Sequence, residues 1–221
     1  MNKIKLVIFD VNETLFHFKE IEKRFLTIGL EKNMCSLWFS NILKEGFSLS
    51  CTNHFHPFRK ISKTQLKGIL QNNNVKNTNE KIKYILDGFN KLKAHKDVKK
   101  SFEILKKKKK ILTTLTNGHS RVTKLLLKNN GLEKYIDKCF SVDDVKKWKP
   151  SAEPYLNVVN FFKLKRNEVI MIAAHSWDIS GAKNAGLITG YISRFEGSFI
   201  NYYKKPDFYG KNLEDLAKKI S

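Results

Sequence analysis

Polar residues that could carry chemistry lie at or just beyond the ends of several apolar runs. Asp10 comes directly after the run LVIF, and a carboxylate is ionised at neutral pH, so it can attack a substrate without an adjacent base. A carboxylate at a strand end often caps a helix or a loop instead, so Asp10 alone leaves both roles open. Three further groups occupy similar places: Thr116 with Asn117, Lys149, and residues 175–178. These four positions are the candidates for chemistry.

Alternating strand and helix patterns predict that these positions share one sheet. The opening KLVIFD is typical of a buried strand, and strand patterns recur at KILTTLT, near CFSV, at EVIMIAA and at TGYIS, with helical patterns between them. This order predicts an α/β fold with a doubly wound parallel sheet. Because the site of such a sheet lies at the carboxyl ends of its strands, we expect the four positions to converge.

Residues 16–95 have a different character. They contain several helical patterns, for example over 36–47 and 81–92, separated by polar segments such as CTNHFHP and QNNNVKNTN. We interpret this block as a helical cap domain, inserted into a core domain that consists of residues 1–15 and 96–221. A chain of 221 residues is long enough for such a core with one insertion.

Composition narrows the class of protein. No run approaches the roughly 18 apolar residues of a membrane span, and the N-terminal apolar run is too short for a signal peptide. Cys35, Cys51 and Cys139 lie far apart without CxxC spacing, which argues against a disulfide framework and against a zinc site. We therefore expect a cytoplasmic protein with no membrane partner.

The net charge of +21 suggests a polyanion partner such as a nucleic acid. However, only five of the 42 basic residues are arginine, the residue that most often reads phosphates and bases through bidentate contacts. The densest run, at 106–110, is more simply explained as a solvated helix end. We expect no nucleic-acid partner, although a positive field should attract anionic substrates.

Four sequence strings resemble, in the same order, the four motifs of the haloacid dehalogenase superfamily. FDVNETLF resembles the first motif, in which an Asp after an apolar strand attacks the substrate and a Thr-Leu pair follows, here Asp10, Thr14 and Leu15. LTNG at 115–118 resembles the second motif, WKP at 148–150 the third and AAHSWD at 173–178 the fourth. The resemblance spans nearly the whole core and implies a hydrolase with Asp10 as its nucleophile.

Asn12 points to one branch of this superfamily. Phosphatases of the superfamily carry a second Asp two residues after the nucleophile, which protonates the leaving alkoxide, and asparagine cannot do this. A halide leaves without protonation. The string WDISGAKNAGLITGYISR, which ends at Arg194, resembles the L-2-haloacid dehalogenase branch, in which no metal is used. We therefore expect neither a metal nor another cofactor.

The resemblance implies a two-step reaction on a small anionic organic acid. Asp10 displaces the halide of an (S)-2-haloacid with inversion at C2, and water then cleaves the aspartyl ester. Asp178 is the expected base for that water, with Lys149 and His175 in support. The residues expected to contact the substrate in the core are Asn12, Thr116, Asn117 and Trp177.

The cap departs from the branch at one place. The branch usually carries an arginine on the second cap helix, shortly after an aromatic residue, to receive the halide. This chain has Trp38, Ser40 and Asn41 in that stretch and no arginine. We include all three among the expected substrate contacts, although packing within the helices is the commoner role for a residue such as Trp38. Halide capture would then depend on Asn41, Asn117, Trp177 or the general positive field.

Two other functions stay open at this stage. A metal-dependent phosphatase, or another hydrolase of the same superfamily, is disfavoured by Asn12 and by the single carboxylate, Asp178, of the fourth motif. A non-catalytic protein that binds polyanions is the third candidate. The sequence does not settle the oligomeric state, and a homodimer is kept as a candidate assembly.

Overall fold

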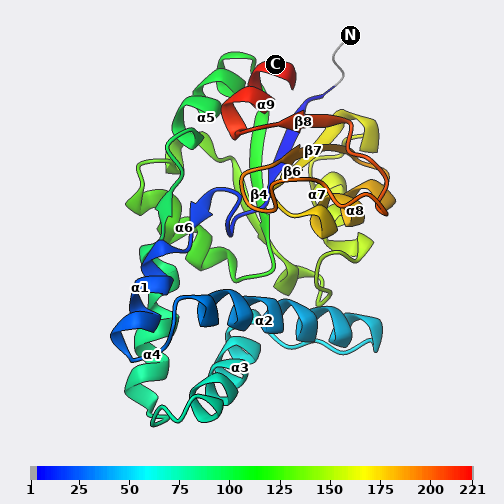
Figure 1. The fold of residues 1–221 in the computed structure, drawn as a ribbon. Helices are drawn as coiled ribbons and strands as arrows, with labels where there is room; N and C mark the ends of the chain where they lie inside the picture. The colour runs from blue at the N-terminus through cyan, green and yellow to red at the C-terminus, as the bar shows by residue number, and fades with distance from the viewer. Residues whose placement is uncertain (1–3, 221) are drawn as a thin grey trace.

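The computed structural model describes residues 4–220, which form a six-stranded parallel sheet with helices on both sides (Figure 1). The strand order is β5-β4-β1-β6-β7-β8. The strands are β1 (Leu6–Phe9), β4 (Ile111–Thr116), β5 (Lys138–Ser141), β6 (Val169–Ala173), β7 (Ile188–Ile192) and β8 (Phe208–Gly210). Since β1 pairs with both β4 and β6, Asp10 leaves the sheet at the centre of its carboxyl edge.

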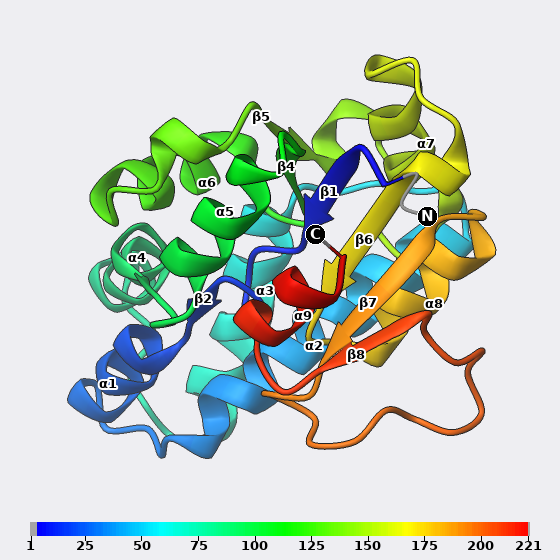
Figure 2. The ribbon, with the colours of Figure 1, turned by 90° about the horizontal axis from the view of Figure 1, so that it is seen from above.

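Side chains of each strand alternate between two hydrophobic layers. Val7 and Phe9 of β1 belong to a cluster that includes α5, α6 and α9, whereas Leu6 and Ile8 belong to a second cluster with α7 and α8. Figure 2 shows α5 and α9 on one side of the sheet and α7 on the other. The helices are α5 (Val98–Lys107), α6 (Ser120–Asn129), α7 (Ala152–Phe161), α8 (Ser176–Asn184) and α9 (Leu213–Ile220). The doubly wound α/β fold expected from the sequence is confirmed.

The range 16–95, expected as a helical cap, is mostly helical. Its elements are β2 (Phe16–His17), α1 (Lys19–Thr27), α2 (Asn33–Cys51), α3 (Phe58–Asn72), α4 (Asn79–Asp87), the 3-10 helix η1 (Gly88–Lys91) and β3 (Lys93–Ala94). β2 and β3 pair with each other and so bring the two ends of the range together. Figure 1 places α1–α4 beyond the carboxyl ends of the central strands. We keep the division into core and cap as a proposal.

The structure adds features that the patterns did not predict. β8 is a three-residue edge strand whose Tyr209 is exposed, so its sequence lacks the apolar run of the other strands. Lys149 lies well beyond β5, in the loop after a 3-10 helix, rather than close to a strand end. The short 3-10 helices of the core are η2 (Glu133–Tyr135), η3 (Val142–Asp144) and η4 (Arg166–Glu168). No helix within residues 4–220 is both long enough and apolar enough to span a membrane.

The loop that carries Lys149 is fixed to the helical range through the preceding residue, Trp148. Its indole is fully buried, donates to the carbonyl of His56 and stacks on Phe58. Its backbone amide bonds to Ser50 at the end of α2. Gly46 of α2 lies so close to the ring that a side-chain methyl at that position would overlap it.

We therefore expect Gly46→Ala to lower the free energy of unfolding by about 1–3 kcal/mol, because the packed indole has no room to move. Urea denaturation would measure it. Gly68→Ala is the matched control: a methyl on this glycine of α3 meets nothing within 4 Å and should raise stability by up to about 1 kcal/mol through helix propensity. If Gly46→Ala is as stable as the parent, the close packing of α2 on Trp148 is wrong.

Candidate active site

The ammonium of Lys149 joins the two carboxylates expected from the sequence. Its Nζ donates to Asp10 Oδ1 at 2.9 Å, to Asp178 Oδ2 at 2.6 Å and to the carbonyl of Leu115 at 3.1 Å. An ammonium has three donors, so all of them are used. The side chains of Lys149 and Asp178 are fully buried, and only 7% of the Asp10 side chain is exposed. The sheet therefore brings Asp10, Lys149 and Asp178 into one buried cluster.

Asp10 is held as an ionised carboxylate at the end of β1. Burial raises its pKa, but the charges of Lys149 and His175 outweigh burial and hold the pKa well below its usual range. Thr14 donates to Asp10 Oδ2 at 2.7 Å, and the amide of Ala174 donates to the Thr14 hydroxyl at 2.9 Å. One oxygen thus faces the lysine and the other faces the threonine, which fixes the plane of the carboxylate.

His175 lies on the other side of Asp10, at the N-terminus of α8. Its Nδ1 is 3.5 Å from Asp10 Oδ2, a charge contact longer than a good hydrogen bond, and its Nε2 is 3.0 Å from Glu13 Oε2. Burial disfavours the imidazolium, but the nearby carboxylates of Asp10 and Glu13 outweigh it and raise the pKa of His175 to about 10. The ring stacks on Trp177, which in turn contacts Phe47 of α2.

Two residues of this cluster were not predicted from the sequence. Glu13 lies in the turn after β1 with a left-handed backbone, φ 61°, and this turn aims its carboxylate at His175. Tyr155 of α7 is fully buried and donates to Asp178 Oδ1 at 2.6 Å. Glu13 lies inside the string FDVNETLF, but the resemblance gives it no role, and Tyr155 lies within a helix rather than at a strand end.

The second group, at the end of β4, supports the lysine loop. Asn117 Oδ1 accepts a hydrogen bond from the backbone amide of Lys149 at 3.0 Å, while its Nδ2 is buried without a partner within residues 4–220. The hydroxyl of Thr116 accepts from the amide of Gly118 at 2.9 Å, which leaves its proton available to a ligand. An amide donor and a hydroxyl donor next to Asp10 can hold an anion.

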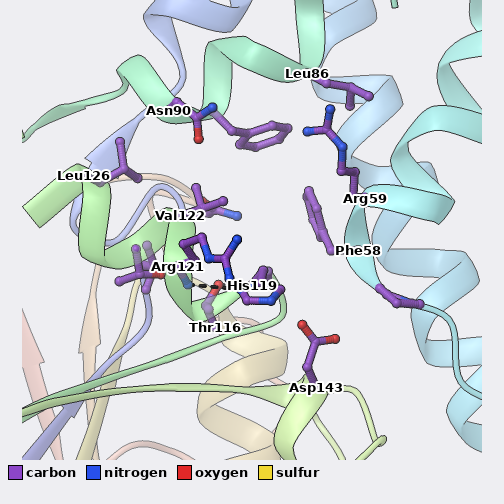
Figure 3. Close-up of a pocket in the computed structure, with 16 residues that line it drawn as sticks. Phe58, Arg59, Leu86, Asn90, Thr116, His119, Arg121, Val122, Leu126 and Asp143 are labelled. Atoms are coloured by element: carbon purple, nitrogen blue, oxygen red, sulfur yellow. Dashed lines mark hydrogen bonds between the residues drawn. The ribbon is translucent and has the colours of Figure 1, made fainter. Parts of the chain in front are cut away.

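Two hollows flank the buried cluster. One, of about 330 Å³, has Asn12 and Thr116 in its lining (Figure 3). The other, of about 410 Å³, is lined by Ser40 of α2 together with Glu13, His175 and Trp177. Asp10 itself lines neither hollow, but Val11 and Asn12 line the first and Glu13 lines the second.

The structure does not bring Trp38 or Asn41 to these hollows. Trp38 is fully buried among the helices, where its Nε1 donates to the carbonyl of Ser62 and its ring contacts Phe25 and Phe89. Asn41 is half-buried and lines neither hollow. Among the three cap residues expected at the site, only Ser40 reaches it.

The other candidate groups form no second centre. Cys35, Cys51 and Cys139 are free thiols. Over the described range 4–220, no three side chains of His, Cys, Asp or Glu are grouped so that they could hold a metal ion.

The charge of His175 predicts how stability depends on pH. Because its folded pKa, about 10, lies above the unfolded value of about 6.5, its contribution is complete below pH 6.5 and is lost as the pH rises to 10. We expect the free energy of unfolding to fall more steeply across this window in the parent than in His175→Gln, as measured by urea denaturation at a series of pH values. In Glu13→Gln the pKa of His175 should be lower, because the Glu13 carboxylate no longer stabilises the imidazolium, so the same loss of stability should occur at lower pH. An imidazole that titrates below pH 7 by NMR would contradict this assignment.

Comparisons with known proteins agree with the fold and with the motifs. The chain matches the profile of the haloacid dehalogenase-like hydrolase family over residues 7–192. It is 22% identical over 225 residues to (S)-2-haloacid dehalogenase 2 of Pseudomonas sp. (strain CBS-3), a match that covers 100% of this chain and 97% of the relative.

Two solved structures of the L-2-haloacid dehalogenase from Xanthobacter autotrophicus have the same fold. One has a TM-score of 0.90 at 20% identity, with 98% of both chains covered. The other, with chloropropionic acid covalently bound, has a TM-score of 0.89 at the same identity and coverage. The profile match alone spans most of the sequence, and it shows that this chain belongs to the haloacid dehalogenase-like hydrolase family.

Proposed function

We propose that this hydrolase is an (S)-2-haloacid dehalogenase that acts through a covalent ester on Asp10. The observation that carries the proposal is the buried, ionised carboxylate of Asp10, bound to Lys149 at 2.9 Å and oriented by Thr14. Lys149 and Thr14 fix the direction of the buried Asp10 carboxylate, so that an attacking oxygen is already oriented before the substrate binds. The name of the Pseudomonas relative, and the covalently bound acid in the Xanthobacter structure, support the same reaction class.

In the first step, an oxygen of Asp10 attacks C2 of the acid from the side opposite the halogen. The C2–O bond forms as the carbon–halogen bond breaks, so the halide leaves with the bonding electron pair and C2 is inverted. The substrate carboxylate is proposed to bind at Thr116 and Asn117, which offer a hydroxyl proton and an amide donor. No acid is required for a halide, which is compatible with an asparagine at position 12.

Halide capture needs a donor other than a cap arginine. Asn117 Nδ2 is a buried donor with no partner in the described chain, and its orientation is fixed because Oδ1 accepts from the Lys149 amide. An unpaired buried donor is costly, so an anion that accepts from it gains binding energy. We propose Asn117 Nδ2 as the donor that receives the departing halide.

In the second step, water attacks the carbonyl carbon of the Asp10 ester. A base takes the water proton and returns it to the departing hydroxy-acid oxygen, which came from Asp10. Asp178 is the proposed base, with Lys149 stabilising the oxyanion. Each oxygen of Asp178 already accepts one hydrogen bond, from Lys149 or from Tyr155, so the proton of the water goes to a remaining lone pair. His175 is proposed to balance the charge of Asp10 from the opposite side.

The origin of the product oxygen tests this route. In a single turnover of 2-chloropropionate with excess enzyme in heavy-oxygen water, the label should enter the peptide that contains Asp10, and the product should be largely unlabelled and inverted at C2. Mass spectrometry of the peptide and of the acid measures both. Label in the product alone would show that water attacks C2 directly.

The variant Asp10→Asn tests the same role of Asp10 by removing the nucleophile. The amide is nearly isosteric but a poor nucleophile, so kcat should fall by roughly a thousand-fold or more while the fold is retained. Chloride release measures the rate, and circular dichroism checks the fold. A folded Asp10→Asn protein with parental activity would remove Asp10 from the mechanism.

A parallel screen for halide and phosphate release separates this proposal from a phosphatase. We expect halide release that persists in EDTA, because the chain's own lysine supplies the positive charge between Asp10 and Asp178. Phosphate release that requires magnesium would move the assignment to the phosphatase branch. Asn12→Asp is the informative variant here, since a strong gain of phosphatase activity would show that the rest of a phosphate site is present.

A further inference from the structure

The hollow of about 330 Å³ extends well beyond the reacting groups (Figure 3). Val11, Asn12, Thr116 and Gly118, all next to the buried cluster, line one part of it. The remainder lies between α3, the end of α4 and η1 on one side and α6 on the other. Its lining there is apolar, from Phe58, Leu86, Phe89, Val122 and Leu126.

This hollow is larger than a small haloacid needs. Its volume falls within the range of about 300–1,000 Å³ for pockets that bury drug-sized molecules. An acid such as chloropropionate, with its carboxylate at Thr116, would leave the part between α3 and α6 empty. The shape therefore accommodates an acid with a longer carbon chain, laid against the two phenylalanines.

The charged side chains of the hollow define what the far end of that chain should carry. Arg59 of α3 and Arg121 of α6 extend into the space from opposite walls (Figure 3). Within residues 4–220 neither guanidinium has an ion-pair or hydrogen-bond partner, whereas Arg24 and Arg194 are paired with Glu20 and Asp97. A guanidinium presents a planar fork that matches a carboxylate.

The single carboxylate in the lining does not neutralise this pair. Asp143 lies at the end of the hollow opposite Arg59 (Figure 3). Within residues 4–220 it forms no ion pair with Arg59 or Arg121. An apolar passage lined by two arginines without partners is complementary to a chain that ends in a negative charge.

We propose that the preferred substrate is a 2-halo dicarboxylic acid. Its reacting end lies at Asp10 and Thr116, its methylene chain packs between Phe58 and Val122, and its distal carboxylate binds Arg59 and Arg121. The identity of the reacting end rests on the proposed function, whereas the recognition of the distal carboxylate rests on the hollow itself.

Binding of unreactive acids tests the hollow without any turnover. Calorimetric titration with the straight-chain dicarboxylates from succinate to suberate should give an affinity that peaks at one chain length. At that length the dicarboxylate should bind roughly ten-fold more tightly than the monocarboxylate with the same number of carbons, the gain expected from a carboxylate held by two exposed arginines. Equal affinities for the two series would overturn the proposal.

Charge-matched variants separate recognition from the general positive field. Arg59→Gln and Arg121→Gln should each remove roughly five-fold of the dicarboxylate affinity and little of the monocarboxylate affinity. Lys67→Gln on α3 and Lys124→Gln on α6 change the net charge equally at exposed residues outside the lining, and both should bind like the parent. The same loss in all four variants would overturn the specific site.

Chloride release then links the hollow to the reaction. The parent should have a higher kcat/KM for 2-chloroadipate than for 2-chlorohexanoate, and Arg59→Gln should reduce this preference roughly five-fold. An enzyme that dehalogenates 2-chloropropionate but shows no such preference, and no arginine-dependent binding, would refute this inference and leave the proposed function intact. Arginine-dependent binding of dicarboxylates with no chloride release would refute the proposed function and leave the hollow's specificity standing.

Discussion

The buried ammonium of Lys149, between the carboxylates of Asp10 and Asp178, is the interaction on which the rest of the site depends. Burying one charge costs several kcal/mol unless partners compensate it, so these three groups are stable only together. Asp10 follows β1, Leu115 belongs to β4, Asp178 belongs to α8, and the lysine is on a loop. The single cation therefore ties four segments at the carboxyl edge of the sheet to one geometry.

Neighbouring groups restrict each member of this cluster to one orientation. Thr14 holds Asp10, Tyr155 holds Asp178, and Asn117 holds the backbone of Lys149. The residue before the lysine, Trp148, is packed against α2 and α3, so the helical range contributes to the position of the ammonium. A substitution in those helices that shifts this loop would also move the ammonium of Lys149, even where the substituted residue does not contact the substrate.

The basic residues of this protein differ in their surroundings. Most lysines lie on the surface, where they create a field that draws small anions without selecting among them. Lys149 is different because it is fully buried and has carboxylate partners. Arg59 and Arg121 are exposed like the lysines, but both line one hollow and have no partner within residues 4–220. The surroundings of each cation therefore depend on its position and not on the total charge of +21.

The sequence by itself determined the parallel sheet, since apolar runs alternating with helical patterns allow few other folds, and it placed Asp10, Thr116 and residues 175–178 at strand ends. Only the tertiary structure decided which side chains meet. The bond from Lys149 to Asp10 spans 139 positions, and the lysine reaches it from a loop that no periodic pattern describes. Glu13 contacts His175 because Glu13 itself has a left-handed backbone in the turn after β1. The ring of Trp38 is buried among the helices and therefore does not face the site. Such choices depend on side-chain direction and on contacts between distant segments, which local sequence patterns do not encode.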